Sequence, residues 1–196
     1  MFDVPDDELV IARARKGDMA AMETLYRAFE VPVYNLGRRL LNRPEEAEEV
    51  LQETFLEVFR SLKRFRGDGP LGLWIRKITV SKALMRVRNR ASKPEVQFQD
   101  EEPADPSAMT VGRWGEAGAL LDRFKLEAAL AKLPEMTRTV VWLHDVEGYT
   151  HEEIASLMKK TASFSKSQLA RAHARLREIL SPFEEAVPCT PAATNC

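Results

Sequence analysis

The stretch "THEEIASLMKKTASFSKSQLARAHARLREIL", residues 150–180, decides the fold of this chain. Its hydrophobic spacing predicts two helices around a tight turn, the first over 151–159 and the second over 162–180. Thr150 is followed three residues later by Glu153, the spacing of a capping box, which fixes where the first helix begins. Two helices joined in this way are typical of a helix-turn-helix.

The second helix of this pair has two different faces. At about 100° per residue, Leu169, Ala172, Leu176 and Ile179 fall on one side and form the stripe expected of a core. The other side carries Ser163, Phe164, Ser167, Gln168, Arg171 and Arg175, and Lys166 adds a further positive charge. Arg and Gln can pair with guanine and adenine edges, while Lys and Ser can hold phosphates. This face therefore predicts DNA reading, and the alternative is the solvated basic face of a helical bundle.

Helical signals dominate the whole chain and strand signals are nearly absent, which predicts an all-α protein. We expect two small helical domains, 1–91 and 119–182, joined by a flexible acidic linker over 92–118. That linker contains three prolines and several acids without a sustained period. The tail 183–196 is expected to be flexible, with its two cysteines, Cys189 and Cys196, reduced rather than in a redox or metal role.

Four signals place or break helices in the first domain. Asp18 is a predicted N-cap, and Pro32 is expected to interrupt or kink the helix that follows it. Pro44 stands where an acidic helix should begin. The sequence "RGDGP" at 66–70 predicts a loop, after which helical spacing returns over 71–90.

Charge is segregated along the chain, although the net charge is only −1. Residues 45–57 hold six glutamates and no base, whereas residues 60–90 hold ten Lys or Arg against the single Asp68. A solvated surface usually interleaves the two signs. Separate blocks indicate separate partners of opposite charge, and nucleic acid is expected to be one of them.

Composition excludes several classes of protein. The chain is 44% hydrophobic and 30% charged, as ordinary globular proteins are, and no apolar run approaches the roughly 18 residues of a membrane span. The acidic start "MFDVPDDELV" does not read as a signal peptide, so we expect a cytoplasmic protein without membrane insertion. The sequence "HEEIA" at 151–155 lacks the second His of a zinc-peptidase motif, and the three histidines are scattered. We expect no catalytic residue, no metal and no cofactor.

Two long stretches resemble one known family. The sequence "LAKLPEMTRTVVWLHDVEGYTHEEIASLM" with "SKSQLARAHARLREIL" looks like region 4 of bacterial extracytoplasmic-function (ECF) sigma factors. The sequence "EEAEEVLQETFLEVFRSLKRFRGDGPLGLWIRKITVSKALMRVRNR" resembles their region 2. The resemblance covers roughly residues 8–90 and 120–180. It implies a dissociable promoter-specificity subunit of RNA polymerase, in which region 4 reads the −35 element and region 2 reads and opens the −10 element.

The resemblance also implies partners and contact residues. Core RNA polymerase would be bound through its β′ clamp helices and β flap, and the matching positions for the clamp are Glu49, Gln52 and Glu53, with Leu56 as an apolar anchor. The −10 DNA, duplex and then single-stranded, would be bound by Arg66, Gly67, Asp68, Arg76, Lys77, Ser81, Arg86 and Arg88. The −35 duplex would be bound by the seven residues of the basic helix named above. Trp74 recurs at helical spacing with core residues, so we expect it in the core rather than stacked on a base. Family members are commonly controlled by an anti-sigma factor, which implies such a partner here.

The chain departs from the family pattern at four positions. Ser81 stands where the family usually has Asn, and Met85 where it has Asp. Lys159 replaces a turn glycine, which predicts a positive φ at a residue that tolerates it poorly. Ser165 occupies an inward position that is usually apolar. Three other interpretations stay open: a helix-turn-helix repressor of another class, a sigma-like decoy that only titrates an anti-sigma factor, and an enzyme.

Overall fold

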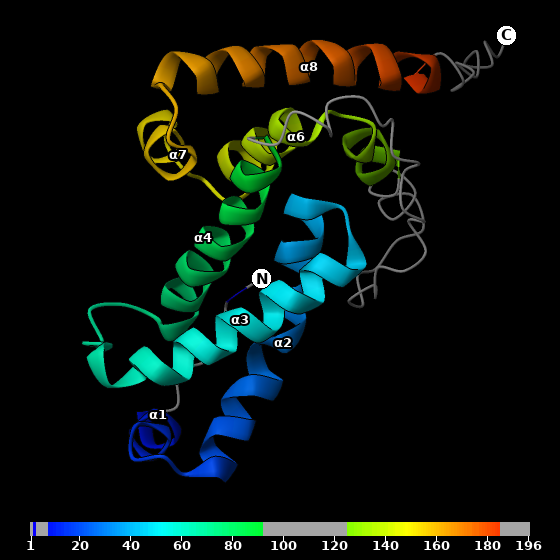
Figure 1. Ribbon diagram of the computed structural model, residues 1–196. Helices are drawn as coiled ribbons and strands as arrows, with labels where there is room; N and C mark the ends of the chain where they lie inside the picture. Colours follow the sequence, from blue (N-terminus) through cyan, green and yellow to red (C-terminus); the bar gives the residue numbers. More distant parts are fainter. Residues whose placement is uncertain (1, 3–7, 92–124, 185–196) are drawn as a thin grey trace, which may run out of the picture.

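The structure of the protein is a computed structural model that describes residue 2, residues 8–91 and residues 125–184. These residues form helices joined by turns, and no strand occurs among them. The helices belong to two parts, one before and one after residues 92–124 (Figure 1). The prediction of an all-α fold with two helical domains is therefore confirmed. The predicted linker and tail lie outside the described residues, apart from the end of the last helix.

The first part contains four α-helices and one short 3₁₀ turn. The polypeptide caps them as the sequence predicts, because the Asp18 side chain accepts hydrogen bonds from the amides of Ala20 and Ala21, and Pro44 stands at the first turn of an acidic helix. Pro32 lies inside a helix that continues through it, so it does not interrupt the helix. The elements are α1 (Glu8–Arg15), α2 (Met19–Leu41), α3 (Pro44–Ser61), η1 (Leu62–Arg64) and α4 (Leu71–Ala91).

Helices α2, α3 and α4 enclose the core of this part, and two glycines allow close approach. Gly37 of α2 faces the backbone of Ala47 in α3, where an added Cβ would lie 3.5 Å away. Gly72 of α4 faces the carbonyl oxygen of Phe2, and a Cβ there would lie only 2.1 Å from that oxygen. Phe2 is itself buried, so the amino-terminal residue that the structure describes packs against the start of α4.

The second part begins with a helix over 125–131 and ends with the helix pair that decides the fold. The capping box at Thr150 and Glu153 is present, with both reciprocal hydrogen bonds. Lys159 ends the first helix of the pair in the left-handed conformation, φ +53°, as the replacement of a turn glycine predicts. The named elements are α6 (Glu135–Val141), a π-helical turn η4 (Trp142–Val146), α7 (His151–Met158) and α8 (Ala162–Glu184).

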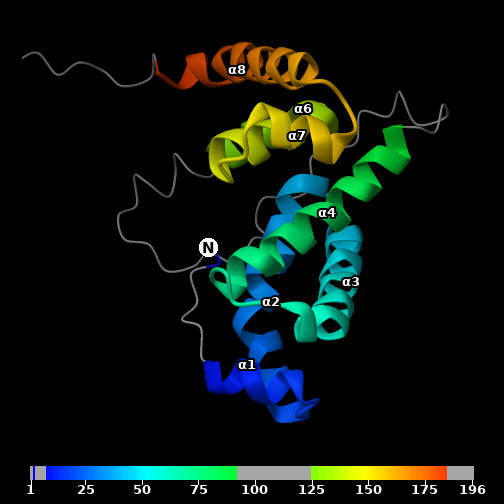
Figure 2. The same cartoon turned by 90° about the vertical axis from the view of Figure 1, so that its left-hand side faces the viewer.

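The two parts pack against each other, which the sequence did not predict. Figures 1 and 2 show α6 and α7 over one end of the bundle formed by α2 and α4, with α8 on the outer side. Thr139 donates a hydrogen bond to the carbonyl of Leu40 (3.4 Å), and Arg138 donates to the carbonyl of Leu41 (3.4 Å). Burial lowers the pKa of Arg138 to about 10, although Glu135 opposes the shift. One cluster of buried apolar side chains extends from the first part into the second.

No helix among the residues that the structure describes has the length and apolarity needed to cross a membrane.

Candidate nucleic-acid interface

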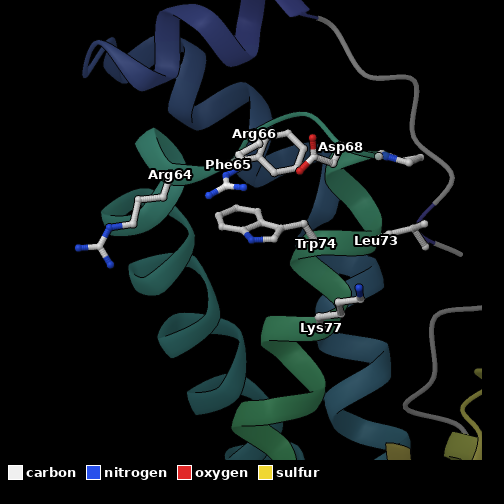
Figure 3. A pocket seen from close by; sticks show the side chains of 9 residues that line it. Arg64, Phe65, Arg66, Asp68, Leu73, Trp74 and Lys77 are labelled. Atoms are coloured by element: carbon white, nitrogen blue, oxygen red, sulfur yellow. The ribbon is translucent and has the colours of Figure 1, made fainter.

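A cavity of about 430 Å³ lies where the glycine-rich loop meets the start of α4 (Figure 3). Its wall combines two aromatic rings with basic side chains, and Phe65 and Trp74 approach each other with ring centroids 5.2 Å apart. Gly67 adopts φ +80°, a left-handed conformation that residues with a side chain rarely adopt. Glycine therefore allows the loop to turn beside the cavity. The lining residues are Arg64, Phe65, Arg66, Asp68, Gly69, Pro70, Leu73, Trp74 and Lys77.

A second cavity, of about 470 Å³, adjoins the first along α4. Trp74 and Lys77 line both cavities, so the indole of Trp74 lies between them. Ser81 lines the second cavity, and beside it Lys82 approaches Glu57 of α3 at 3.9 Å. Trp74 packs against the core cluster as expected, but it is only half-buried and also lines both cavities. Arrangements of this kind can stack a planar base and hold its phosphate.

Sequence reasoning missed Arg64, Phe65 and Leu73 as lining residues. Phe65 stands directly before the glycine-rich loop and Trp74 four residues after its end, and this placement of two aromatic residues on either side of the loop is the signal that the sequence offered. Helical spacing assigns Trp74 to the core face of α4. Periodicity alone does not reveal that the first turn of a helix lacks neighbours on one side, so it did not indicate that Trp74 also lines the cavities.

Three of the arginines predicted to contact −10 DNA do not line these cavities. Arg76 forms an ion pair with Glu147 (Nε to Oε2, 2.8 Å) and its guanidinium lies 5.1 Å from the ring centroid of Tyr149. Arg88 donates a hydrogen bond to the carbonyl of Leu157. Both contacts are with the second part of the molecule, so these two side chains have protein partners in this structure, and their predicted contact with −10 DNA stays a prediction. Burial raises the pKa of Glu147, and this effect outweighs the opposing effect of Arg76 and Arg39.

The third of these arginines joins two predicted sites. Arg86 forms ion pairs with Glu49 and Glu53 on α3, the glutamates predicted to bind core RNA polymerase. Glu49 keeps 58% of its side chain exposed, and Leu56 is 57% exposed. Gln52 is exposed as well. The structure therefore brings the four predicted polymerase-binding residues to one helix, with a cation from α4 beside them.

The second helix of the helix-turn-helix presents most of its predicted DNA-reading residues to the surface. Ser163, Lys166, Ser167, Arg171 and Arg175 are exposed, and Phe164 is half-buried. Lys160 lies over the ring of Phe164, 5.7 Å from its centroid, and Arg175 pairs with Glu178 at 2.8 Å.

Gln168 is the exception on this helix. Its side chain is buried and accepts a hydrogen bond from the Thr137 hydroxyl of α6 (2.7 Å). The expectation that it lies on the outward face is wrong in this structure, because it fixes α8 to α6 instead.

The three histidines, scattered in the sequence, lie close together in the structure. The rings of His144 and His151 stack with centroids 4.4 Å apart, and His173 contacts Asp145 at 2.7 Å. Burial raises the pKa of Asp145, but hydrogen bonds from His173 and His144 outweigh it and hold the pKa below its usual value. His151 is 3.0 Å from the hydroxyl of Ser165, which explains how a buried serine is accommodated at this inward position. No described group of three His, Cys, Asp or Glu residues is arranged to hold a metal ion.

Comparison with known proteins agrees with this geometry. Residues 25–93 match the family model for Sigma-70 region 2, and residues 123–176 match the model for Sigma-70, region 4. The RNA polymerase sigma-H factor of Pseudomonas aeruginosa is 27% identical over 190 residues, which cover 93% of this chain and 98% of that protein. The ECF RNA polymerase sigma factor SigM of Mycobacterium tuberculosis is 30% identical over 176 residues, which cover 89% of this chain and 84% of SigM.

A solved structure shows the same fold. The sigma factor RpoE of Bartonella quintana, in complex with the anti-sigma factor NepR, superposes with a TM-score of 0.50 at 21% identity, covering 78% of this chain and 92% of that chain. Both family models, in this order along the chain, together with the similarity to SigM over most of its length, show the family. The chain belongs to the ECF sigma factors, which are transcription initiation factors of bacterial RNA polymerase.

Proposed function

We propose that the chain directs promoter-specific initiation by binding core RNA polymerase, reading −35 duplex with α8, and holding the opened −10 strand at the start of α4. Helix α3 docks on the polymerase through Glu49, Gln52, Glu53 and Leu56. Control by an anti-sigma factor is part of the proposal, and the Bartonella quintana relative bound to its anti-sigma factor supports it.

The observation that carries the proposal is the cavity between the glycine-rich loop and α4. It is lined by the rings of Phe65 and Trp74 and by three basic side chains, and its volume of about 430 Å³ is ample for a planar base. Bases of a paired duplex are stacked and cannot enter such a cavity, whereas a base expelled from the stack can. Expelling a base costs a few kcal/mol, and stacking on aromatic rings returns about 1–3 kcal/mol per base. Binding energy alone can therefore favour opened DNA.

Within this cavity we assign stacking to Trp74 and phosphate contacts to Arg66 and Lys77. Ser81, in the adjoining cavity, is close enough along α4 to contact a neighbouring base. Gly67 and Asp68 shape the loop, and they offer backbone and carboxylate groups to the bound base. Because Arg76, Arg86 and Arg88 have protein partners in this structure, their contacts with DNA require those partners to be released.

Trp74→Leu tests the assignment, because leucine keeps apolar volume but removes the aromatic face. We expect the holoenzyme that contains Trp74→Leu to bind a −10 non-template single strand about 1–3 kcal/mol more weakly than wild type. Fluorescence of 2-aminopurine placed at successive −10 positions reports which base is expelled and whether it is stacked. The matched control is Phe59→Leu, which removes a half-buried ring of α3 that does not line either cavity.

The outcome against the proposal is equally definite. If Trp74→Leu and Phe59→Leu holoenzymes bind the strand like wild type and the fluorescence is unchanged, the cavity does not receive a base. If the wild-type chain does not assemble with core RNA polymerase at all, the proposal fails as a whole.

A further inference from the structure

One wall of the first cavity, between the glycine-rich loop and α4, is held by a residue of α1 that does not line it. Arg15 is the last residue of α1, and its Nη2 atom donates a hydrogen bond to the carbonyl oxygen of Phe65 at 2.5 Å. The guanidinium of Arg15 also lies over the Phe65 ring, 5.7 Å from its centroid. Arg15 lines neither of the two cavities described above. It therefore acts on the first cavity only through Phe65.

Phe65 is restrained both at its backbone and at its ring. Its amide donates to the carbonyl of Leu62 (3.2 Å), which ends η1, and its own carbonyl accepts from Arg15. Its ring lies next to the indole of Trp74, with 5.2 Å between the centroids (Figure 3). The carbonyl of Phe65 is the last one before the loop 66–70 begins. Arg15 therefore fixes the point from which the loop starts.

Helix α1 is itself fixed, so Arg15 is directed at η1. Ile11 and Ala14 are buried, which anchors α1 on the bundle. At the end of α1, Arg13 pairs with Asp18, the N-cap of α2, at 2.7 Å. Helix α1 packs against η1, the segment that leads to the loop. The side chain of Arg15 thus links one fixed helix to the start of the loop.

The guanidinium of Arg15 is committed to protein contacts. Its Nε atom is buried, its Nη2 atom donates to the Phe65 carbonyl, and its plane lies over the Phe65 ring. A phosphate would have to displace that carbonyl before it could bind the guanidinium. The geometry therefore favours a role in shaping the cavity over a direct contact with the strand.

We infer that Arg15 is a positioning residue for strand binding, which fixes Phe65 and the glycine-rich loop so that the first cavity is formed before a base arrives. This inference rests on the proposed function, because it concerns the cavity that is proposed to receive a base. A loop that is already ordered does not have to be ordered when the strand binds, so the affinity for the strand is higher. Helix α1, for which the sequence predicted no contact with DNA, thus contributes to strand binding.

Arg15→Met tests the inference, because methionine keeps an apolar stem and removes both the donor and the charge. We expect the holoenzyme that contains Arg15→Met to bind a −10 non-template single strand about tenfold more weakly than wild type. The matched control is Lys16→Gln, which removes the same charge from the next residue, an exposed one that lines neither cavity. Salt screens such an exposed charge, so the control should change affinity by less than about twofold.

Two measurements separate positioning from a phosphate contact and from a general loss of folding. A lost phosphate contact lowers the slope of log affinity against log salt by about 1, whereas a lost positioning contact leaves that slope unchanged. The second measurement uses a −10 strand with an abasic site at the position where 2-aminopurine reports the expelled base. Wild type and Arg15→Met should bind this strand equally, because no base enters the cavity. A general loss of folding weakens the binding of both strands alike.

A double-mutant cycle with Trp74→Leu tests whether Arg15 acts through the same cavity. If it does, the effects of Arg15→Met and Trp74→Leu are not additive, and the double variant binds the strand about as weakly as the weaker single variant. Additive effects would overturn the inference, because they would show that Arg15 acts independently of the cavity.

Hydrogen exchange tests the anchoring of the loop without DNA. In the free, full-length chain we expect the amides of residues 66–69 to exchange faster in Arg15→Met than in wild type, while those of α3 exchange at the same rate. Circular dichroism shows whether Arg15→Met is folded. If it is not, Arg15→Lys takes its place in every comparison, because lysine keeps the charge but lacks the planar group that can both donate to the carbonyl and lie over the ring. Unchanged exchange in the loop would overturn the inference.

Failure of this inference is distinguishable from failure of the proposed function. If Trp74→Leu weakens strand binding and Arg15→Met does not, only the role of Arg15 is wrong. If the wild-type holoenzyme shows no preference for a strand with a base over the abasic strand, the cavity does not receive a base, and the proposed function fails with it.

Discussion

Lys159 ends α7 with φ +53°, a left-handed conformation that costs a residue with a side chain about 1–2 kcal/mol. Its amide donates to the carbonyls of Ala155 and Ser156, which are the orphan acceptors of the helix end. The turn of the helix-turn-helix is thus built with a strained residue where glycine would fit.

Lys159→Gly should stabilise the protein. Relief of strain is partly offset by the greater freedom of glycine in the unfolded chain, so we expect a net gain of about 0.5 kcal/mol in the free energy of unfolding. Urea denaturation followed by circular dichroism measures it. Ser156→Gly, three residues earlier and in the helix, is the matched control and should lose a similar amount. Destabilisation by both substitutions would show that the left-handed conformation is not strained.

Gln168 and Arg171 are neighbours on α8 with different surroundings. Substitution by alanine should therefore affect stability at Gln168 and DNA binding at Arg171. Gln168→Ala leaves the buried Thr137 hydroxyl without its acceptor, so we expect a loss of about 1–2 kcal/mol in the free energy of unfolding. Arg171→Ala should leave stability within about 0.5 kcal/mol but weaken −35 binding by the holoenzyme by about 1–3 kcal/mol. Denaturation and a promoter-binding titration check both. The opposite assignment of the two effects would place Gln168, not Arg171, in the groove.

Local features of the site could be predicted from sequence, and long-range packing could not. The capping box at Thr150 depends on a neighbour three residues away, which the sequence displays directly, and the left-handed Lys159 and the inward Ser165 follow from comparison with the family pattern. The positions of Arg76 and Gln168 depend on partners 71 and 31 residues away. Helical periodicity assigns a face but does not reveal which other helix covers it, so Gln168 was expected on the outward side of its helix, and the protein partners of Arg76 were not foreseen.

At the scale of elements, α3 combines a buried stripe with an outward face of glutamates and one exposed leucine. Leu56 is 57% exposed beside Glu53 and Gln52, and an apolar side chain among acids suits a basic protein groove rather than DNA. Arg86 of α4 pairs with Glu49 and Glu53, so ion pairs link this face of α3 to α4. The proposed polymerase-binding and DNA-binding surfaces therefore lie on the adjacent helices α3 and α4.

Leu56→Glu should abolish assembly with core RNA polymerase, because it places a desolvated charge at the centre of the docking surface. We expect a loss of at least 2 kcal/mol in binding to the core enzyme, measured by fluorescence anisotropy of the labelled chain. Met19→Glu introduces the same change at a side chain that is 76% exposed on α2, and it should bind like wild type. Equal binding by both variants would show that this face of α3 is a solvated surface and does not dock on the polymerase.

At the scale of the whole molecule, the second part packs on one end of the first, over α2 and α4 (Figures 1 and 2). Long-range contacts from α2 and α4 to α6 and α7 join helices that are far apart in sequence, and residues 92–124 connect them outside the described part of the chain. Across this boundary, acidic residues of the second part pair with arginines of the first.

In vitro transcription with core RNA polymerase on a pool of genomic promoters tests the central claim most directly. The 5′ ends of the transcripts are mapped with the wild-type chain, with Leu56→Glu and without any sigma factor. The account predicts new start sites that depend on the wild-type chain, share two sequence motifs at the −35 and −10 positions, and disappear with Leu56→Glu. Start sites that are identical with and without the chain, or that share no upstream motif, would contradict it.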